Sequence, residues 1–185
     1  KYWPTVRKCP KVKITASSAN PYLKVINNDI YSKNGKVLYS VASTKTKYKV
    51  KKSVKEIEDG AFYKNDSIKS IYLPDSVKEI GEEAFGDMEN LQSIRFSRSI
   101  SELDYAMFNK CKKLKTVKLP KRIQTIRGNF GGKKNCYLKK IYINAVNLKK
   151  SNLKSLPKKC KVYVKSKNVK NQVKKAGFKG KVIIR

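Results

Sequence analysis

The stretch Ser53-Val54-Lys55-Glu56-Ile57 returns 23 residues later as Ser76-Val77-Lys78-Glu79-Ile80, and two more steps lead to 99–103 (SISEL) and 122–126 (RIQTI). A phenylalanine column follows the same step through Phe62, Phe85 and Phe108. Separate columns that agree on one period are typical of a solenoid, in which each repeat forms one coil. Because a solenoid presents a long open surface, the sequence predicts binding rather than catalysis.

Each repeat also predicts the shape of its coil. The segments 68–73, 91–96 and 114–119 alternate between apolar and polar residues, which predicts short parallel strands that form an inner sheet. Pro74 and Pro120 end two of these strands, because proline cannot donate to a strand ladder. The phenylalanines fall on the opposite limb, where we expect a short helical or 3₁₀ turn in each coil and a stacked aromatic spine. The fourth coil carries Phe130 one position early, and its glycines at 128, 131 and 132 predict a bulging loop.

The segments on either side of the repeats are predicted to differ from them. Residues 29–32 and 36–39 alternate around Lys33-Asn34-Gly35, which indicates a β-hairpin that projects from the solenoid. After the repeats, we expect a strand at 160–164, a cap helix that ends at Gly177 and a last strand at 181–184. These elements give an α/β solenoid in one domain, 1–185. Its predicted parts are the end of an incomplete upstream coil (1–21), a hairpin insertion (22–50), four repeats (51–145) and a C-terminal cap (146–185).

Charge is distributed very unevenly along the chain. In total, 45 Lys and Arg stand against 13 Asp and Glu, for a net charge of +32. Residues 105–185 contain 26 of the basic residues and no acid, because the last acidic residue is Asp104. Such a field attracts polyanions with strong salt dependence, although lysine as a general solubiliser is an equal alternative. Arginine is scarce, which weakens sequence-specific nucleic-acid recognition, since base reading draws on the guanidinium fork.

The sequence gives little support for metal, cofactor or catalytic chemistry. Its four cysteines are dispersed, at Cys9, Cys111, Cys136 and Cys160, and the chain has no histidine to complete a mixed zinc site. We expect reduced structural thiols, with a disulfide as the alternative. The absence of histidine also excludes the usual activated Ser and Cys nucleophiles. The neighbouring acids Glu82 with Glu83 and Glu102 with Asp104 are interpreted as solvated turn residues rather than a catalytic pair. No apolar run is long enough to span a bilayer, and the start at Lys1, without a signal-like segment, predicts a piece of a longer chain.

Outward side chains of the parallel strands define a candidate ligand-binding face. One predicted column contains Lys13, Tyr72, Arg95, Lys118, Tyr142 and Tyr163. A second column, two positions earlier in each strand, contains Lys11, Ser70, Ser93, Thr116, Lys140 and Lys161. Rings could stack on sugars or peptide groups while ammonium groups meet sulfate, carboxylate or phosphate. Exposed strand positions also favour Tyr, Thr and Lys by propensity alone, so a purely structural role is the alternative.

The motif Leu73-Pro74-Asp75-Ser76-Val77-Lys78-Glu79-Ile80-Gly81-Glu82-Glu83-Ala84-Phe85 resembles the repeat of the BspA-like (Treponema pallidum-type) leucine-rich repeat surface proteins. That repeat reads Leu-Pro-x-Ser-Val-x-x-Ile-Gly-x-x-Ala-Phe-x-x-Cys-x-x-Leu. The similarity covers about residues 50–143, with Met88 in place of a frequent cysteine and Ser97 in place of a frequent proline. It implies a leucine-rich repeat fold and a secreted or cell-surface bacterial protein associated with adhesion. The family has no shared catalytic residues to transfer.

Three functions follow as hypotheses. The first is a non-enzymatic adhesin-type module, extracellular or on the bacterial surface, that binds a host or microbial protein or an anionic glycan through the inner sheet face. The second is a polyanion-binding module that holds teichoic acid, sulfated glycan or extracellular DNA by charge density alone, with steep salt dependence. The third is a structural spacer within a larger surface protein.

Overall fold

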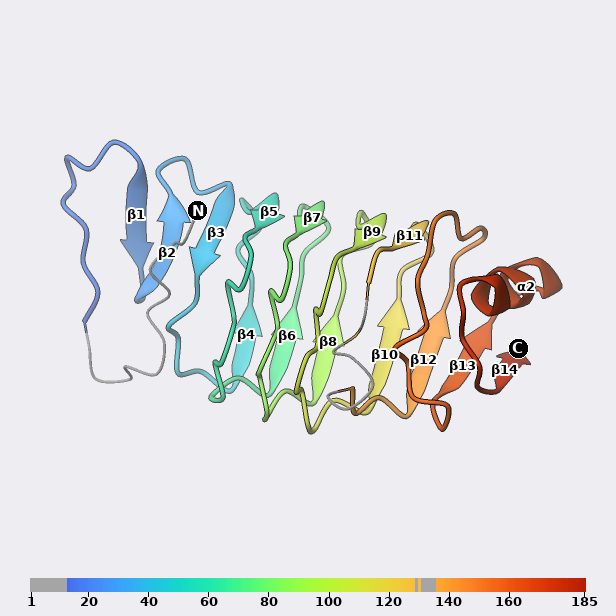
Figure 1. The fold of residues 1–185 in the computed structure, drawn as a ribbon. Helices are drawn as coiled ribbons and strands as arrows, with labels where there is room; N and C mark the ends of the chain where they lie inside the picture. The colour runs from blue at the N-terminus through green and yellow to red at the C-terminus, as the bar shows by residue number, and fades with distance from the viewer. Residues whose placement is uncertain (1–12, 129, 131–135) are drawn as a thin grey trace.

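In the computed structural model, which describes residues 13–128, 130 and 136–185, each repeat forms one coil and the coils stack side by side (Figure 1). One row of strands lines a single side of the stack. The alternation of the repeat and cap segments predicts its later members, whereas its first member, β4 (Lys47–Lys49), was not expected from the sequence. The row consists of β4, β6 (Ser70–Tyr72), β8 (Ser93–Arg95), β10 (Thr116–Leu119), β12 (Lys140–Ile143), β13 (Lys161–Val164) and β14 (Val182–Ile184). Neighbouring members pair in parallel as two sheets, β4-β6-β8 and β10-β12-β13-β14.

The recurrent motif itself forms a second row of short strands along another edge of the stack. These are β5 (Glu56–Ile57), β7 (Glu79–Ile80), β9 (Glu102–Leu103) and β11 (Thr125–Ile126), paired in parallel as β5 with β7 and β9 with β11. The apolar residue of each strand is buried: Ile57, Ile80, Leu103 and Ile126. Each strand has only two residues, so alternation along the sequence could not reveal this row.

The limb that carries the phenylalanines consists of turns rather than the expected helical or 3₁₀ segments. Single i→i−3 bonds are present, such as Tyr63 N–H to the Gly60 carbonyl at 2.8 Å. However, left-handed residues interrupt each turn, among them Glu83 (φ 48°) and Asp87 (φ 54°). They turn backbone N–H groups toward the next coil, so that Phe62 N–H donates to the Ala84 carbonyl at 2.8 Å. The limb therefore uses its donors between coils, where a helix would use them internally.

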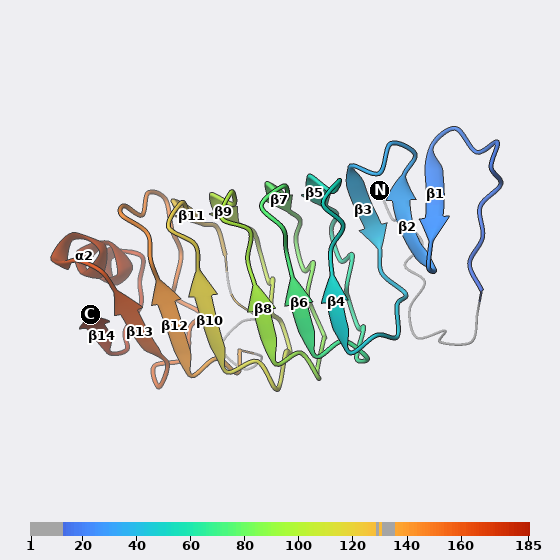
Figure 2. The same cartoon turned by 180° about the vertical axis from the view of Figure 1, so that it is seen from behind.

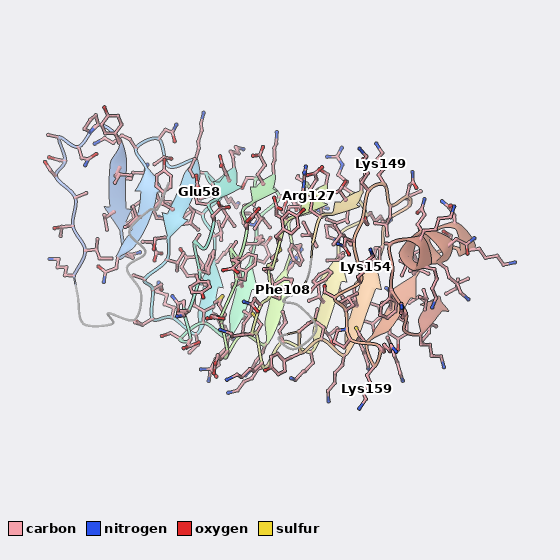
Figure 3. All side chains as sticks on the ribbon, in the orientation of Figure 1. Glu58, Phe108, Arg127, Lys149, Lys154 and Lys159 are labelled. Atoms are coloured by element: carbon pink, nitrogen blue, oxygen red, sulfur yellow. The ribbon has the colours of Figure 1, made fainter. Side chains whose placement is uncertain are left out.

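The expected aromatic spine runs through the centre of the solenoid. Ring centroids lie 5.3 Å apart between Phe62 and Phe85 and 5.9 Å apart between Phe85 and Phe108. The stack continues to Phe130 on one side, at 6.3 Å from Phe108, and to Tyr48 on the other, at 5.2 Å from Phe62. Phe108 lies between the strand rows in Figure 3. The predicted bulge at Gly131 and Gly132 lies outside the described residues.

The N-terminal hairpin joins the sheet instead of projecting from the solenoid, contrary to the prediction. β2 (Asp29–Ser32) pairs antiparallel with β3 (Val37–Ser40) and with β1 (Leu23–Ile26). β3 then pairs in parallel with β5, so the antiparallel strands extend the second row (Figure 2). This pairing gives the backbone groups along one edge of β5 a partner, which a projecting hairpin would leave exposed.

At the other end, the helix α2 (Lys167–Lys175) packs beside β14 (Figure 1). Ser166 precedes it, and the Ser166 hydroxyl accepts a hydrogen bond from Val169 N–H at 3.2 Å, as an N-cap does. Val169 and Val173 bury the apolar face of the helix. Gly177 follows with φ 90°, a conformation that favours glycine after a helix end.

Candidate ligand-binding face

Strand register brings most of the predicted first column together. Tyr72 is the partner of Arg95 across β6 and β8, and Lys118, Tyr142 and Tyr163 are successive partners across β10, β12 and β13. Lys13 does not belong to this column, because it lies outside the strands. Its expected place is taken by Lys49, which lies in β4 and is the register partner of Tyr72. We call Lys49, Tyr72, Arg95, Lys118, Tyr142 and Tyr163 the ladder.

The second column is also in register. Ser70 is the partner of Ser93, and Thr116, Lys140 and Lys161 are successive partners. Lys47 occupies the first place, opposite Ser70, while the predicted Lys11 lies outside the described residues. One sequence signal could have identified β4: Tyr48 stands 23 residues before Ile71, one full period. Both columns therefore start from this strand.

The tyrosine rings of the ladder face their neighbours along the stack rather than solvent. The Tyr142 and Tyr163 centroids are 4.7 Å apart with an interplanar angle of 16°. Lys49 Nζ lies 5.4 Å and Arg95 Cζ 4.9 Å from the Tyr72 ring centroid, each from one adjacent strand. This is cation–π geometry, and it occupies the ring faces of Tyr72, while Tyr142 covers one ring face of Tyr163. Ring edges and hydroxyl groups are left toward a ligand, which argues against the predicted stacking of these rings on sugars.

The ladder and its neighbouring column concentrate positive charge on one face. Lys118 Nζ lies 5.8 Å and Arg185 Cζ 4.4 Å from the Tyr142 ring centroid. The ion pairs formed within the described part of the chain use other cations: Arg98–Asp75, Lys110–Asp87, Lys112–Glu89 and Arg127–Glu102. The strands from β10 onward carry no acidic residue, since none follows Asp104. Nitrogen-tipped side chains accordingly surround this half of the molecule in Figure 3.

Several of the acids gather along the second row of strands. A hollow of about 400 Å³ there is lined by acids that include Glu56, Glu79 and Glu102. Burial raises the pKa of Glu56, and the neighbouring carboxylates raise it further. Burial likewise raises the pKa of Glu82, with Asp104 contributing, while Glu102 accepts a 2.9 Å hydrogen bond from Arg127 Nε. Within the described ranges, no cluster of three or more His, Cys, Asp or Glu could hold a metal ion.

Cys111, Cys136 and Cys160 are buried free thiols, and Cys9 lies outside the described residues. Burial raises their pKa values, to about 12 for Cys111, about 11 for Cys136 and about 12 for Cys160. The Cys111 thiol also lies 3.0 Å from the Phe85 carbonyl oxygen, to which it donates. Their raised pKa values keep these groups protonated at neutral pH, so they fill core space as neutral thiols. Because the thiolate is the reactive form, we expect them to react slowly.

This burial predicts slow thiol chemistry in the native protein. In a Cys9→Ser variant, we expect the three remaining thiols to react with a disulfide reagent at about pH 8 at least 100-fold more slowly than a free cysteine does. All three should react at once after unfolding in guanidinium chloride. A thiol that reacts quickly in the native Cys9→Ser variant would contradict the buried placement.

Comparison with known proteins gives a consistent fold. The family model described as the BspA type leucine rich repeat region matches residues 23–162 in six copies, beyond both ends of the four predicted repeats. The pneumococcal vaccine antigen PcpA is similar at 22% identity and a TM-score of 0.67, over 91% of this chain and 49% of that one. A leucine rich cell surface protein of Faecalibacterium prausnitzii has 24% identity and a TM-score of 0.65, over 97% and 43%.

A leucine rich repeat protein of T. pallidum is similar at 18% identity and a TM-score of 0.56, over 92% of this chain and 100% of that one. The chain thus spans about half the length of the pneumococcal and Faecalibacterium proteins. No curated protein matches it. Within the part of the chain that the structure describes, no helix is long and apolar enough to cross a membrane.

Proposed function

Because the chain belongs to the BspA-type leucine-rich repeat family, we propose that it is a non-enzymatic binding module of the bacterial surface that holds an anionic ligand on its inner sheet face. Leucine-rich repeat domains are open scaffolds without an enclosed active site, which supports a binding role. The surface location is supported by one similar protein described as a cell surface protein and another described as a vaccine antigen.

The ladder is the observation that carries this proposal. Lys49 and Arg95 flank Tyr72 in register across β4, β6 and β8, Lys118 is in register with Tyr142, and the neighbouring column adds Lys140 and Lys161. A linear anion laid along the stack would meet one cation after another, with tyrosine hydroxyl groups between them as hydrogen-bond donors. Since the ring faces are occupied by stacking and cation–π contacts, charge and hydroxyl contacts carry the affinity. The ligand class is an anionic glycan or an acidic surface protein.

Retention on immobilised heparin distinguishes binding by the ladder from binding by total charge. We expect the wild type to elute from immobilised heparin at higher salt than from a sulfonate resin of similar charge density. The Lys118→Ala/Lys140→Ala/Lys161→Ala variant should lose this excess and bind heparin roughly 10- to 100-fold more weakly, because three charge contacts are removed. Replacing Tyr142 and Tyr163 by Ala should weaken heparin binding less than the triple lysine variant does, because the rings only support the neighbouring cations.

The matched control is Lys158→Ala/Lys159→Ala/Lys179→Ala, which removes three exposed lysines outside the ladder. Lys159 points away from the solenoid in Figure 3. The control should retain the heparin excess. If both triple variants elute together at every salt concentration, binding depends on total charge alone, and the polyanion module replaces the ladder as the function.

A further inference from the structure

The inner sheet is interrupted between β8 and β10, a break that we call the seam. β8 pairs only with β6 and β10 pairs only with β12, so the row divides into sheets of three and four strands among the described residues. The wider spacing between β8 and β10 is visible from both sides of the molecule (Figures 1 and 2). Backbone groups on the two facing strand edges therefore lack the partners that a continuous parallel sheet provides.

Two side chains hold the strand ends in opposite directions. The Ser97 hydroxyl, just after β8, donates to the Val77 carbonyl of the preceding coil at 2.6 Å. The Asn144 amide, from the following coil, donates to the Leu119 carbonyl at the end of β10 at 2.8 Å. Ser97 stands where the repeats before and after have Pro74 and Pro120. Both bonds therefore lie beside the seam and join its strand ends to other coils.

The seam opens into a hollow of about 440 Å³ on the inner face. Its lining includes the apolar side chains of Ile94, Phe96 and Leu119 and the cations Arg95 and Lys118, and it includes no acid. Ile94 is only partly buried, whereas its counterparts Ile71 and Val117 are 3% and 1% exposed. Ile94 therefore offers a partly exposed apolar contact between two cations, whereas Phe96 is 7% exposed and Leu119 is fully buried.

The width of the seam limits what can occupy it. A peptide strand placed between β8 and β10 would need them about 10 Å apart, twice the usual strand spacing. The two strands still approach to within 8 Å between Cα atoms, so a strand does not fit between them. The hollow does have room for one or two large apolar side chains from a ligand that lies across the seam.

We propose that the seam binds an acidic polypeptide segment that carries an aliphatic or aromatic anchor residue. The anchor packs on Ile94, with the 7% exposed Phe96 beneath it, and flanking carboxylates meet Arg95 and Lys118. This inference rests on the proposed function and names a polypeptide as the partner. A sulfated glycan or nucleic acid supplies the charge without the apolar anchor, so the observations favour a peptide.

Two blocked synthetic peptides of equal length and charge test the anchor without altering the protein. We expect the wild type to bind fluorescein-labelled EELFEE at least about 10-fold more tightly than EESSEE at physiological salt, measured by anisotropy, because two apolar side chains leave water. Equal affinity for the two peptides would overturn the proposal.

Three variants locate the interaction. Ile94→Ser should reduce the preference for EELFEE to below about 3-fold, while EESSEE binding stays unchanged. Arg95→Ala should weaken both peptides about 5- to 10-fold, and Lys159→Ala, an equal change of charge outside the ladder, should not. A preference that survives Ile94→Ser in a folded variant, checked by circular dichroism, would place the anchor elsewhere and overturn the proposal.

The failure of this inference and the failure of the proposed function give different results. If the peptides bind equally and Arg95→Ala weakens both more than Lys159→Ala does, the ladder still binds anions but the seam does not select an anchor. If Arg95→Ala and Lys159→Ala are equivalent and the heparin excess is absent, the proposed function fails as well.

Discussion

Replacing Phe85 with alanine should lower the free energy of unfolding by about 3–5 kcal/mol, the usual cost of removing a fully buried phenylalanine. Phe85 has no exposed surface and stands in the middle of the spine, with Phe62 and Phe108 on either side. Its removal leaves a cavity between two coils whose backbones are hydrogen-bonded to each other and cannot close the space. In a solenoid each coil contacts only its neighbours, so the loss is concentrated at one interface.

Urea unfolding followed by circular dichroism measures this effect. The control is Tyr22→Ala, which removes an aromatic ring that is 77% exposed and should change the free energy of unfolding by less than about 0.5 kcal/mol. A second transition in the Phe85→Ala variant would show that the interface has separated the solenoid into two folding units. A loss below about 1 kcal/mol would contradict the spine as the main element of the core.

Asp29, a buried carboxylate near the N-terminal end, should make the free energy of unfolding depend strongly on pH. Asp29 is 4% exposed, and its Oδ1 accepts hydrogen bonds from the N–H groups of Ala42 at 3.0 Å and Ser43 at 3.1 Å. Its Oδ2 accepts a 2.6 Å bond from the Tyr48 hydroxyl, which lies 3.2 Å from the Tyr31 hydroxyl. Burial outweighs these bonds and raises the pKa of Asp29 to about 6. The group therefore fixes the hairpin to the first coil at the cost of a desolvated charge.

This pKa predicts a stability that falls as pH rises. The folded protein holds the Asp29 proton up to about pH 6, whereas the unfolded chain releases it near pH 3.8. The stabilisation that this bound proton gives the folded state is therefore fully present below about pH 3.8 and is lost as pH rises through about 6. Relative to the wild type, Asp29→Asn should gain about 2–3 kcal/mol between about pH 4 and about pH 7, because the amide carries no charge to desolvate.

Denaturant unfolding of both proteins across this range measures the difference, in which titrations common to both proteins cancel. Asp75→Asn provides a control of opposite sign, because hydrogen bonds from Arg98 lower the pKa of Asp75. In the wild type, the stabilisation that ionised Asp75 gains from Arg98 is present at neutral pH and is lost as pH falls. A constant difference between wild type and Asp29→Asn at every pH would contradict a buried, titrating Asp29.

The repeat period contained most of the information about the ladder. A step of 23 residues aligns Tyr72 with Arg95, and the same apolar alternation places Lys118, Tyr142 and Tyr163 in line even where later coils depart from that length. Such alignment is predictable because core side chains must stack coil on coil. Lys13 was assigned wrongly because a short Lys-Val-Lys-Ile run imitates a strand; Lys49, one period before Tyr72, holds that place.

The coil, its buried columns and the phenylalanine spine are predictable from the sequence, because they follow from local alternation repeated at a constant step. Three features required the three-dimensional structure: the pairing of the hairpin with β5, the covered ring faces of the ladder, and the break between β8 and β10 with the Ser97 and Asn144 bonds beside it. Each of these depends on a contact between residues about 20 or more positions apart, such as the bond from Ser97 to Val77. The 23-residue step aligns residues of neighbouring coils, but it does not specify the side-chain conformation or the individual hydrogen bond, because these form only after the coils have stacked.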